Sequence, residues 1–342
     1  MARINWAIVG CGSIADRRIA PALVKSKLSR LAAVSSRDRS KAEAFAAKYG
    51  GAKPYDSYAA MLADPEVQVV YVGTPNAMHH DDVVAACRAG KHVFCDKPMA
   101  LTLADCAAMT RAAREAGVKL GIGFNNRYNP VHEEMRRRVL AGAIGAVRYA
   151  TLLFAVDRPR QRWRLEADLA GAGCLYDMGV HGLDLMRFLL GDEVTQVTAF
   201  LDVAAHGWPL DVAATGLLKF TSGAVVDITV SSKIPNPRNA IVLYGEKGTL
   251  AAVETLISQM GAAIPPMGRL ETTTAAGTVV DDSFENRDIF QAELDAFSNA
   301  VIAGTEPEIG ARDGMRAQEI ALAMQRSFRE GVAVTLKSED AP

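Results

Sequence analysis

Asp177, His181 and Asp184 follow one another at intervals of four and three residues in the stretch 173–184. In a helix this spacing places all three on one face, where a carboxylate can orient an imidazole for proton transfer. The same spacing also occurs on plain solvated helices. It therefore does not by itself separate a general acid–base pair from a surface ion pair, and the residues upstream must decide.

A second pattern with chemical meaning is the glycine-rich turn Gly10-Cys11-Gly12-Ser13-Ile14-Ala15. It follows the apolar run 4–10 and opens an expected helix over 14–27. The first glycine of such a turn permits the tight bend, the second lets the backbone approach a pyrophosphate, and the small Ala15 allows close helix–strand packing. Free N–H groups at the helix N-terminus would bind the phosphates. We expect a dinucleotide site here rather than a merely structural turn.

The end of the second expected strand bears on the choice of cofactor. An NAD site would place Asp or Glu there, whereas this chain has Ser35-Ser36-Arg37-Asp38. Arg37 can pair with a 2′-phosphate and Ser36 can donate to it, which favours NADP(H). In the alternative interpretation Arg37 is solvated and Asp38 accepts from the ribose after a shift of register, which leaves NAD(H) open.

These residues lie on a chain that alternates strands and helices over 1–124, which predicts a doubly wound parallel Rossmann sheet. Strands are expected at 4–10, 31–36, 67–74, 92–95 and 119–124, and helices at 14–27, 40–49, 79–89 and 103–116. Asp96, Lys97 and Pro98 follow the fourth of these strands. They are therefore expected at the carboxyl edge, where open α/β sheets bind ligands.

Residues 125–342 follow a different pattern and are expected to form a second, α+β domain. Helices are expected at 130–140, 289–302 and 314–328, and strands at 147–156, 194–203, 212–220, 224–231, 240–243 and 248–253. Consecutive strands predict a mostly antiparallel open sheet, whose free face could serve as a subunit interface. Residues 157–173 are expected to form a polar loop, and 257–278 loops and edge structure.

Composition excludes several classes of function. A chain of 342 residues favours two domains, and 38 basic against 39 acidic residues argue against a nucleic-acid or acidic membrane partner. No eighteen-residue apolar window predicts a bilayer span, and the N-terminal strand leaves no room for a signal peptide. The five cysteines include no Cys-x-x-Cys pair, so we expect no metal site and a cytoplasmic location.

Taken together, these motifs resemble the glucose–fructose oxidoreductase/inositol dehydrogenase (Gfo/Idh/MocA) family over nearly the whole chain. That family has a Gly-x-Gly-x-x-Ala turn, a Glu-Lys-Pro motif and a Gly-x-x-x-Asp-x-Gly-x-His-x-x-Asp segment in this order. Further matches lie at 124–130, 163–164 and 245–250. One departure is Asp96, where the family usually has the longer Glu. The Lys97–Pro98 bond resembles one that is often cis in relatives.

The resemblance implies hydride transfer between a nicotinamide, NADP(H) by preference, and a sugar, keto-sugar or polyol. It implies a catalytic group of Lys97, Asp177 and His181, which also contacts substrate, while Asp184 has a structural role. The expected cofactor-binding residues are Gly10, Gly12, Ser13, Ile14, Ala15, Ser36, Arg37, Thr74, Pro75, Asn76, His79, Asp96 and Lys97. Further candidates, for substrate or equally for interdomain contacts, are Arg127, Asp157, Trp163, Arg164 and Tyr176. Relatives imply a homodimer or homotetramer through the C-terminal sheet.

Within the family, the run 163–166 and the segment up to 190 look most like 1,5-anhydro-D-fructose reductases, with inositol and xylose dehydrogenases as close competitors. Two alternatives belong to other functional classes. Some relatives cleave glycosidic bonds with a tightly held NAD, and others are non-catalytic NAD(P)-binding regulators. The regulators rank last, because they would be expected to lose part of the Lys97, Asp177 and His181 set, which is complete here.

Overall fold

The computed structural model describes residues 3–157, 162–203, 210–256 and 267–336. The chain divides into two compact units, the first formed by Met1–Asn125 and Asp288–Met315, the second by Asn126–Arg287 and Arg316–Pro342. The sequence places the domain boundary after residue 124 and assigns everything beyond it to the second domain. The structure differs in one respect, because the segment Asp288–Met315 returns to the first unit.

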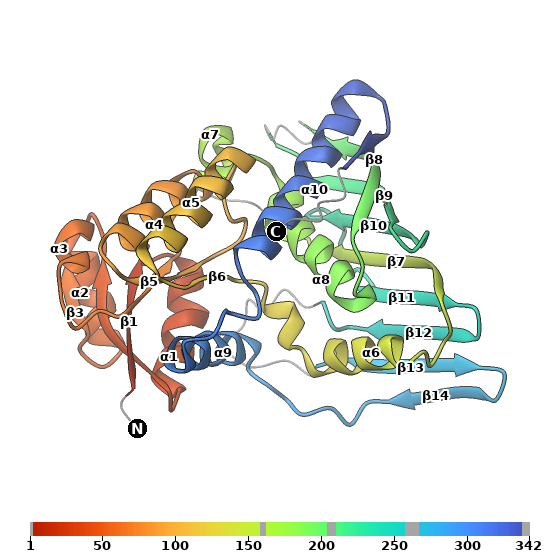
Figure 1. The fold of residues 1–342 in the computed structure, drawn as a ribbon, viewed down its shortest axis with the longest axis horizontal. Coiled ribbons are helices and arrows are strands. Elements are labelled where there is room, and N and C mark those ends of the chain that lie inside the picture. Colours follow the sequence, from red (N-terminus) through yellow and green to blue (C-terminus); the bar gives the residue numbers. More distant parts are fainter. Residues whose placement is uncertain (1–2, 158–161, 204–209, 257–266, 337–342) are drawn as a thin grey trace. The chain divides into compact units, whose positions relative to one another are not determined.

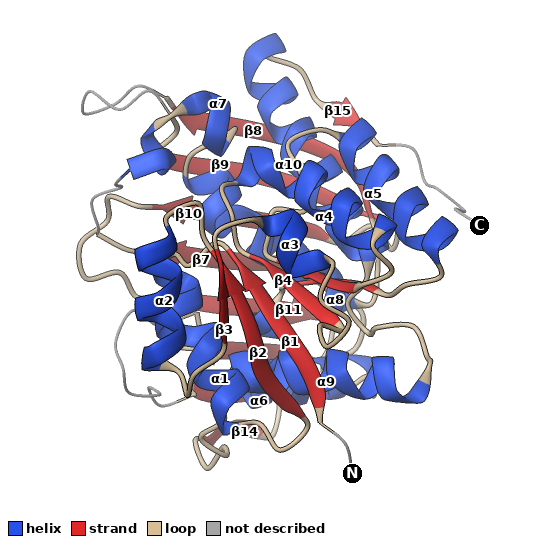
Figure 2. Cartoon of the chain, turned by 90° about the vertical axis from the view of Figure 1, so that its left-hand side faces the viewer, coloured by secondary structure: helices blue, strands red, loops and turns tan. Residues whose placement is uncertain are grey.

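The first unit is built on a parallel sheet of six strands in the order β3-β2-β1-β4-β5-β6, which is the predicted doubly wound Rossmann arrangement. Figure 2 shows β3, β2, β1 and β4 side by side. Since both faces of such a sheet are covered, β4 is buried along its whole length. The strands are β1 (Ile4–Val9), β2 (Ser29–Ser35), β3 (Lys53–Tyr55), β4 (Val69–Val72), β5 (His92–Cys95) and β6 (Leu120–Ile122).

The helices of this unit largely match the predicted ranges. They are α1 (Ala20–Lys25), α2 (Arg39–Lys48), α3 (Tyr58–Leu62), α4 (His79–Arg88), α5 (Leu103–Ala116) and α9 (Ile289–Ala303). Side chains at the N-caps of α2, α3 and α5 accept backbone N–H groups, and Gly117 ends α5 in the left-handed conformation. The helix expected at 14–27 differs, since it opens with a π turn, Ala15–Ile19. Short β3 and α3 carry no periodic signal and are not predicted.

An aromatic cluster explains why α9 belongs to the first unit. The ring of Phe297, on α9, lies 5.7 Å from that of Trp6 on β1 and 5.3 Å from that of Phe94 on β5. The indole N–H of Trp6 donates to Ser298 Oγ at 3.1 Å. The sequence predicts the helix but not its partner, because an apolar stripe does not specify which sheet buries it.

The second unit contains a sheet of nine strands in the order β14-β13-β12-β11-β7-β10-β9-β8-β15 (Figure 1). Only β7 and β10 pair in parallel, so the predicted mostly antiparallel sheet is confirmed. The strands are β7 (Val147–Ala155), β8 (Val194–Asp202), β9 (Ala213–Phe220), β10 (Val225–Ser231), β11 (Ala240–Gly245), β12 (Gly248–Val253), β13 (Arg269–Thr274), β14 (Gly277–Asp281) and β15 (Val334–Thr335).

The prediction of loops and edge structure for 257–278 is wrong where β13 is concerned. This strand pairs with β12 on one side and β14 on the other, so it lies inside the sheet. Its sequence, rich in threonine and charged residues, lacks the apolar alternation of a half-buried strand. Residues 257–266 of the predicted loop lie outside the described residues.

Helices cover one face of this sheet. They are α6 (Pro130–Leu140), α8 (Val180–Leu190) and the part of α10 (Ala311–Glu330) that begins at Arg316. A short α7 (Ala167–Ala170) and a 3₁₀ turn (Arg162–Leu165) lie in the stretch predicted as a polar loop. The uncovered face exposes large side chains, including Phe200 and Leu217. In the described part of the chain no helix has both the length and the apolarity to cross a membrane.

Candidate active site

The glycine-rich turn connects β1 to the first π turn, Ala15–Ile19. Gly10 has a φ of +91°, and a Cβ there would lie 2.6 Å from the carbonyl oxygen of Gly73, so only glycine fits. A Cβ on Gly12 would meet nothing closer than 4.0 Å. Among the described residues no side chain accepts the N–H groups of Ser13, Ile14 or Ala15, and Ala15 is fully buried. The open N–H groups at this helix start are the arrangement that binds a pyrophosphate.

The residues after β2 are the ones on which the two interpretations of the cofactor choice depend. Asp38 is the N-cap of α2, where its Oδ1 accepts from Ser40 Oγ at 2.7 Å and from the Lys41 N–H at 3.2 Å. These hydrogen bonds hold the pKa of Asp38 below its usual value. Arg37 is exposed and forms no ion pair with any residue that the structure describes. Asp38 is therefore engaged locally, while the Arg37 guanidinium is not.

The segment after β4 is joined to the segment after β5 by a histidine. His79 is buried, and its Nδ1 lies 2.8 Å from the Pro98 carbonyl oxygen while its Nε2 lies 3.0 Å from that of Thr74. Thr74 Oγ1 donates to Asp82 Oδ2 at 2.6 Å. The 3₁₀ turn Asn76–Met78 lies between Thr74 and His79, and Pro75 is its N-cap. Both ring nitrogens of this predicted cofactor residue thus contact backbone carbonyls of the two neighbouring loops.

Asp96 and Lys97 follow β5, at the carboxyl edge of the first sheet. Asp96 Oδ1 accepts the backbone N–H of Lys97 at 2.9 Å, and its Oδ2 accepts from Tyr71 Oη at 3.1 Å. Burial raises the pKa of Tyr71, so this phenol is a neutral donor. The Asp96 carboxylate therefore links the backbone of Lys97 to the side chain of Tyr71 on β4. The sequence does not single out Tyr71, although one hydroxyl in an otherwise apolar strand is a signal. The Lys97–Pro98 bond is cis.

In the second unit the Asp/His stretch begins with a second π turn, Leu175–Gly179, which continues into α8. Asp177 lies in the turn and His181 lies in the first turn of α8. Of all residues from Ala172 to Arg187, only Asp177 and His181 are not buried. A solvated helix face would expose several residues in each turn. The surface-pair alternative therefore does not describe this helix.

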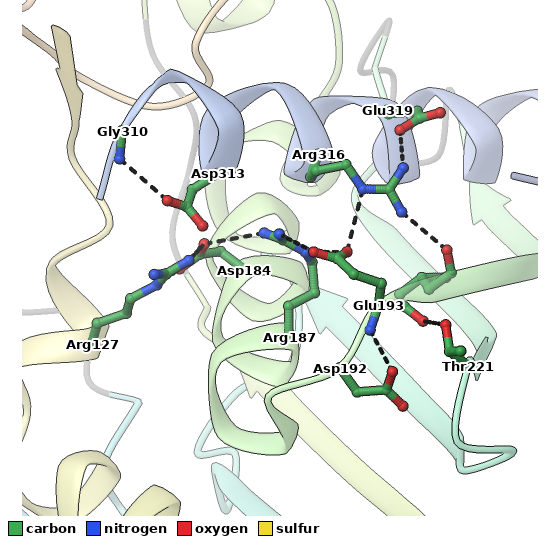
Figure 3. Close-up of polar contacts among 11 residues, drawn as sticks. Arg127, Asp184, Arg187, Asp192, Glu193, Thr221, Gly310, Asp313, Arg316 and Glu319 are labelled. Carbon is green, nitrogen blue, oxygen red and sulfur yellow. Dashed lines mark hydrogen bonds and ion pairs between the residues drawn. The ribbon is translucent and has the colours of Figure 1, made fainter. Parts of the chain in front are cut away.

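A buried network of charged groups surrounds the end of this stretch (Figure 3). Arg127 forms two hydrogen bonds to Asp184, the one from Nε at 2.8 Å. Arg187 donates to Glu193 at 2.8 and 2.6 Å, and Arg316 reaches the same carboxylate at 3.3 Å. Burial opposes ionisation of Glu193, but both arginines lower its pKa. Asp184 is 1% exposed and is paired with the Arg127 guanidinium.

The other substrate candidates differ in accessibility. Arg164 Nε lies 3.9 Å from Asp177 Oδ1, and the Arg164 guanidinium stacks 4.5 Å from the Trp163 ring centroid. Both are half-buried. Tyr176 is buried and accepts from Gln318 Nε2 at 2.7 Å, which is a packing role. Asp157 forms a β-bridge with Lys233. Within this unit, Arg164 is thus the predicted residue that lies against the Asp/His pair.

Comparison with known proteins adds independent information. The profile of an oxidoreductase family with an NAD-binding Rossmann fold (GFO_IDH_MocA) matches residues 4–124, and that of the GFO/IDH/MocA C-terminal domain matches residues 132–251. The 1,5-anhydro-D-fructose reductase of Ensifer adhaerens is 29% identical over 98% of this chain and 99% of its own. The D-xylose 1-dehydrogenase (NADP(+)) 2 of Haloferax volcanii is 30% identical over 97% and 99%.

A solved structure is similar over the same length. The crystal structure of aldose–aldose oxidoreductase from Caulobacter crescentus, complexed with glycerol, has a TM-score of 0.89 and 30% sequence identity. The match covers 98% of this chain and 100% of that one. The similarity therefore extends over both units and not over the Rossmann sheet alone.

Proposed function

Because the chain belongs to the GFO/IDH/MocA family of oxidoreductases, we propose that it transfers a hydride between NADP(H) and a carbon of a sugar, keto-sugar or polyol. The observation that carries this proposal is the partial exposure of Asp177 and His181 in a stretch, residues 172–187, that is otherwise buried. Sugar-acting relatives that align over both units support the substrate class. Reduction of a keto-sugar, by analogy with the Ensifer relative, is the first reaction to test.

The first unit fits a dinucleotide. The turn at Gly10 and Gly12 leaves helix N–H groups open for the pyrophosphate, and Thr74, Pro75 and Asn76 lie at the same carboxyl edge. For the adenosine end, the exposed Arg37 and neighbouring Ser36 would contact a 2′-phosphate. Asp38 Oδ1 caps α2, which disfavours the use of this carboxylate as the ribose acceptor of an NAD site. NADP(H) is therefore the proposed preference, with NAD(H) as the alternative.

When bound, the nicotinamide supplies or accepts the hydride. The chain's own residues handle charge and protons at the substrate oxygen. In the reducing direction, His181 donates a proton to the oxygen of the carbonyl that gains the hydride. Lys97 hydrogen-bonds that oxygen and stabilises its developing negative charge. Asp177 orients His181, and Arg164 pairs with Asp177. In oxidation the same residues act in reverse.

The proposal is tested by an activity panel. Keto-sugars are assayed with NADPH and NADH as hydride donors, polyols with NADP+ and NAD+ as hydride acceptors, and aldoses with both sets. The change in reduced-nicotinamide absorbance is recorded in each case. We expect turnover of at least one sugar class and a higher kcat/KM with NADPH. Cofactor that co-purifies, together with sugar cleavage and no net absorbance change, would instead identify a glycoside-cleaving enzyme. Binding of dinucleotide without any turnover would identify a non-catalytic regulator.

The open face of the nine-stranded sheet supports a proposal about assembly. Phe200 on β8 is 76% exposed and Leu217 on β9 is 50% exposed, while Tyr149 and Tyr244 stack with ring centroids 5.7 Å apart on β7 and β11. Large apolar side chains exposed on an uncovered sheet face commonly mark a protein interface. We propose a homodimer or homotetramer through this face. Light scattering should show the assembly, and Leu217→Asp should shift it to the monomer.

A further inference from the structure

One buried carboxylate lies at the start of the helix that carries Asp177 and His181. Asp211, in the segment between β8 and β9, is 3% exposed. Its Oδ1 accepts the Gly173 N–H at 2.5 Å, and its Oδ2 accepts the Leu175 N–H at 2.8 Å. The Cys174 thiol donates to Oδ2 at 3.1 Å, and the Cys174 N–H donates to the Asp211 carbonyl oxygen at 3.0 Å. Three consecutive residues are thus bound to one side chain and its backbone.

These contacts provide hydrogen-bond partners both for the helix start and for the buried carboxylate. The first N–H groups of a helix have no intrahelical acceptors, and a buried carboxylate needs donors to compensate the loss of water. Asp211 forms no ion pair with any described residue, so the helix N–H groups and the thiol are its compensation. The positive end of the helix dipole adds to this stabilisation. The negative charge and the helix start therefore depend on each other.

The backbone is adapted to this contact. A Cβ on Gly173 would lie 1.8 Å from the Asp211 carbonyl oxygen, so no residue with a side chain could occupy that position without a shift. Further along, a Cβ on Gly182 would lie 2.8 Å from Ile228 Cδ1 on β10. Gly182 therefore sets how closely α8 approaches the sheet. Asp211 fixes where along its axis the helix begins.

We infer that Asp211 is a positioning residue for Asp177 and His181. Asp177 lies two residues beyond the last N–H that Asp211 binds, and His181 follows within the next turn. A displaced helix start would move both groups relative to the substrate, and displacements of about 1 Å at an active site can cost about 10²-fold in rate. The inference rests on the proposed catalytic role of the pair.

The test compares Asp211→Asn and Asp211→Ala with wild type, His181→Ala and a matched control, Asp202→Asn. Asp202 is an exposed carboxylate at the end of β8, whereas Asp211 lies in the segment that follows this strand. In both Asp211 variants the Gly173 and Leu175 amides should exchange hydrogen faster, as measured by mass spectrometry of a peptide that spans residues 170–177. We expect kcat to fall by about 10²-fold in the alanine variant. The cofactor dissociation constant should stay unchanged, because the dinucleotide residues lie in the first unit. Asp202→Asn should match wild type in every measurement.

The outcomes separate the two proposals. Faster amide exchange with a wild-type kcat in both Asp211 variants would show that the contact is only structural and overturn the inference. Full activity of His181→Ala would overturn the proposed function itself. If Asp211→Ala does not fold, Asp211→Asn decides, because it keeps the volume and loses part of the acceptor set. If the role of Asp211 is merely structural, the variants should have a lower melting temperature. Their kcat, measured well below that temperature, should not change.

Discussion

The same backbone feature occurs once in each unit, at a helix that carries predicted site residues. In each, a π turn opens a helix, Ala15–Ile19 in the first unit and Leu175–Gly179 in the second. Each turn follows a glycine that lies against a carbonyl oxygen of another segment. A Cβ would lie 2.6 Å from Gly73 O at Gly10 and 1.8 Å from Asp211 O at Gly173. π turns are frequent at functional sites, and here both follow a chain crossing that only glycine permits.

The difference between the two turns lies in what occupies their N–H groups. At the first π turn no side chain in the described part of the chain accepts the N–H groups of the helix start. At the second, the Asp211 carboxylate accepts the N–H groups of Gly173 and Leu175. An open helix start attracts an anion from outside, and a closed one is neutralised from within. We therefore propose that the same local geometry serves ligand binding in one unit and the placement of two side chains in the other.

The largest effect is expected from removing the imidazole of His181, which lies on the helix whose first N–H groups are bound by Asp211. His181→Ala should lower kcat by roughly 10²–10⁴, because the substrate oxygen loses its proton donor. The dissociation constant for NADPH, measured by fluorescence titration, should stay unchanged, since the open turn is untouched. His80→Ala is the control, because that half-buried histidine pairs with its sequence neighbour Asp81. An activity close to wild type in His181→Ala would contradict the assignment.

Blocking the glycine-rich turn of the first unit should have the opposite effect, because it should weaken NADPH binding. Gly12→Ala should weaken NADPH binding by about 1.5–3 kcal/mol, since the methyl group keeps the pyrophosphate from the backbone donors. The melting temperature should be retained, because a Cβ at Gly12 meets nothing closer than 4.0 Å. Gly10→Ala is the contrasting variant. It should lower both affinity and stability, since it forces a methyl group against Gly73 O.

A third prediction concerns stability and is specific to the second unit. His132 is fully buried, with Nδ1 at 2.8 Å from Asn126 O and Nε2 at 2.8 Å from Thr255 Oγ1. Burial lowers the pKa of His132 to about 4 from an unfolded value of 6.5. Between these values the unfolded chain binds a proton that the folded chain does not, so stability falls as the pH drops below 6.5.

At pH 5 this difference amounts to a loss of about 2 kcal/mol relative to pH 7.5. Urea unfolding of wild type at the two pH values measures it. In His132→Gln, which cannot titrate in this range, the histidine contribution to the pH dependence should disappear. An equal slope in both proteins would show that His132 does not carry the acid sensitivity.

The sequence predicts much of this comparison but not all of it. The turn at Gly10, the edge position of Lys97 and the helix of His181 are readable because each depends on residues adjacent in the chain. Asp211 is not readable, since it follows Gly173 by 38 residues and only the folded sheet brings them together. The same applies to Phe297, whose partners Trp6 and Phe94 lie far upstream. Tyr71 and Asp96 also meet only because β4 and β5 pair.

The smallest effect is expected at the adenosine end of the dinucleotide site, where Arg37 would set the preference for NADPH over NADH. Arg37→Ala should raise the KM for NADPH by roughly tenfold, which corresponds to about 1.4 kcal/mol and to one lost charge-assisted hydrogen bond. The KM for NADH should not change, because that cofactor has no 2′-phosphate. Arg39→Ala is the matched control, since Arg39 is already paired with Glu43 and Asp56. Equal effects on both cofactors in Arg37→Ala would show that Arg37 does not read the phosphate. The preference would then have to come from another residue of the first unit.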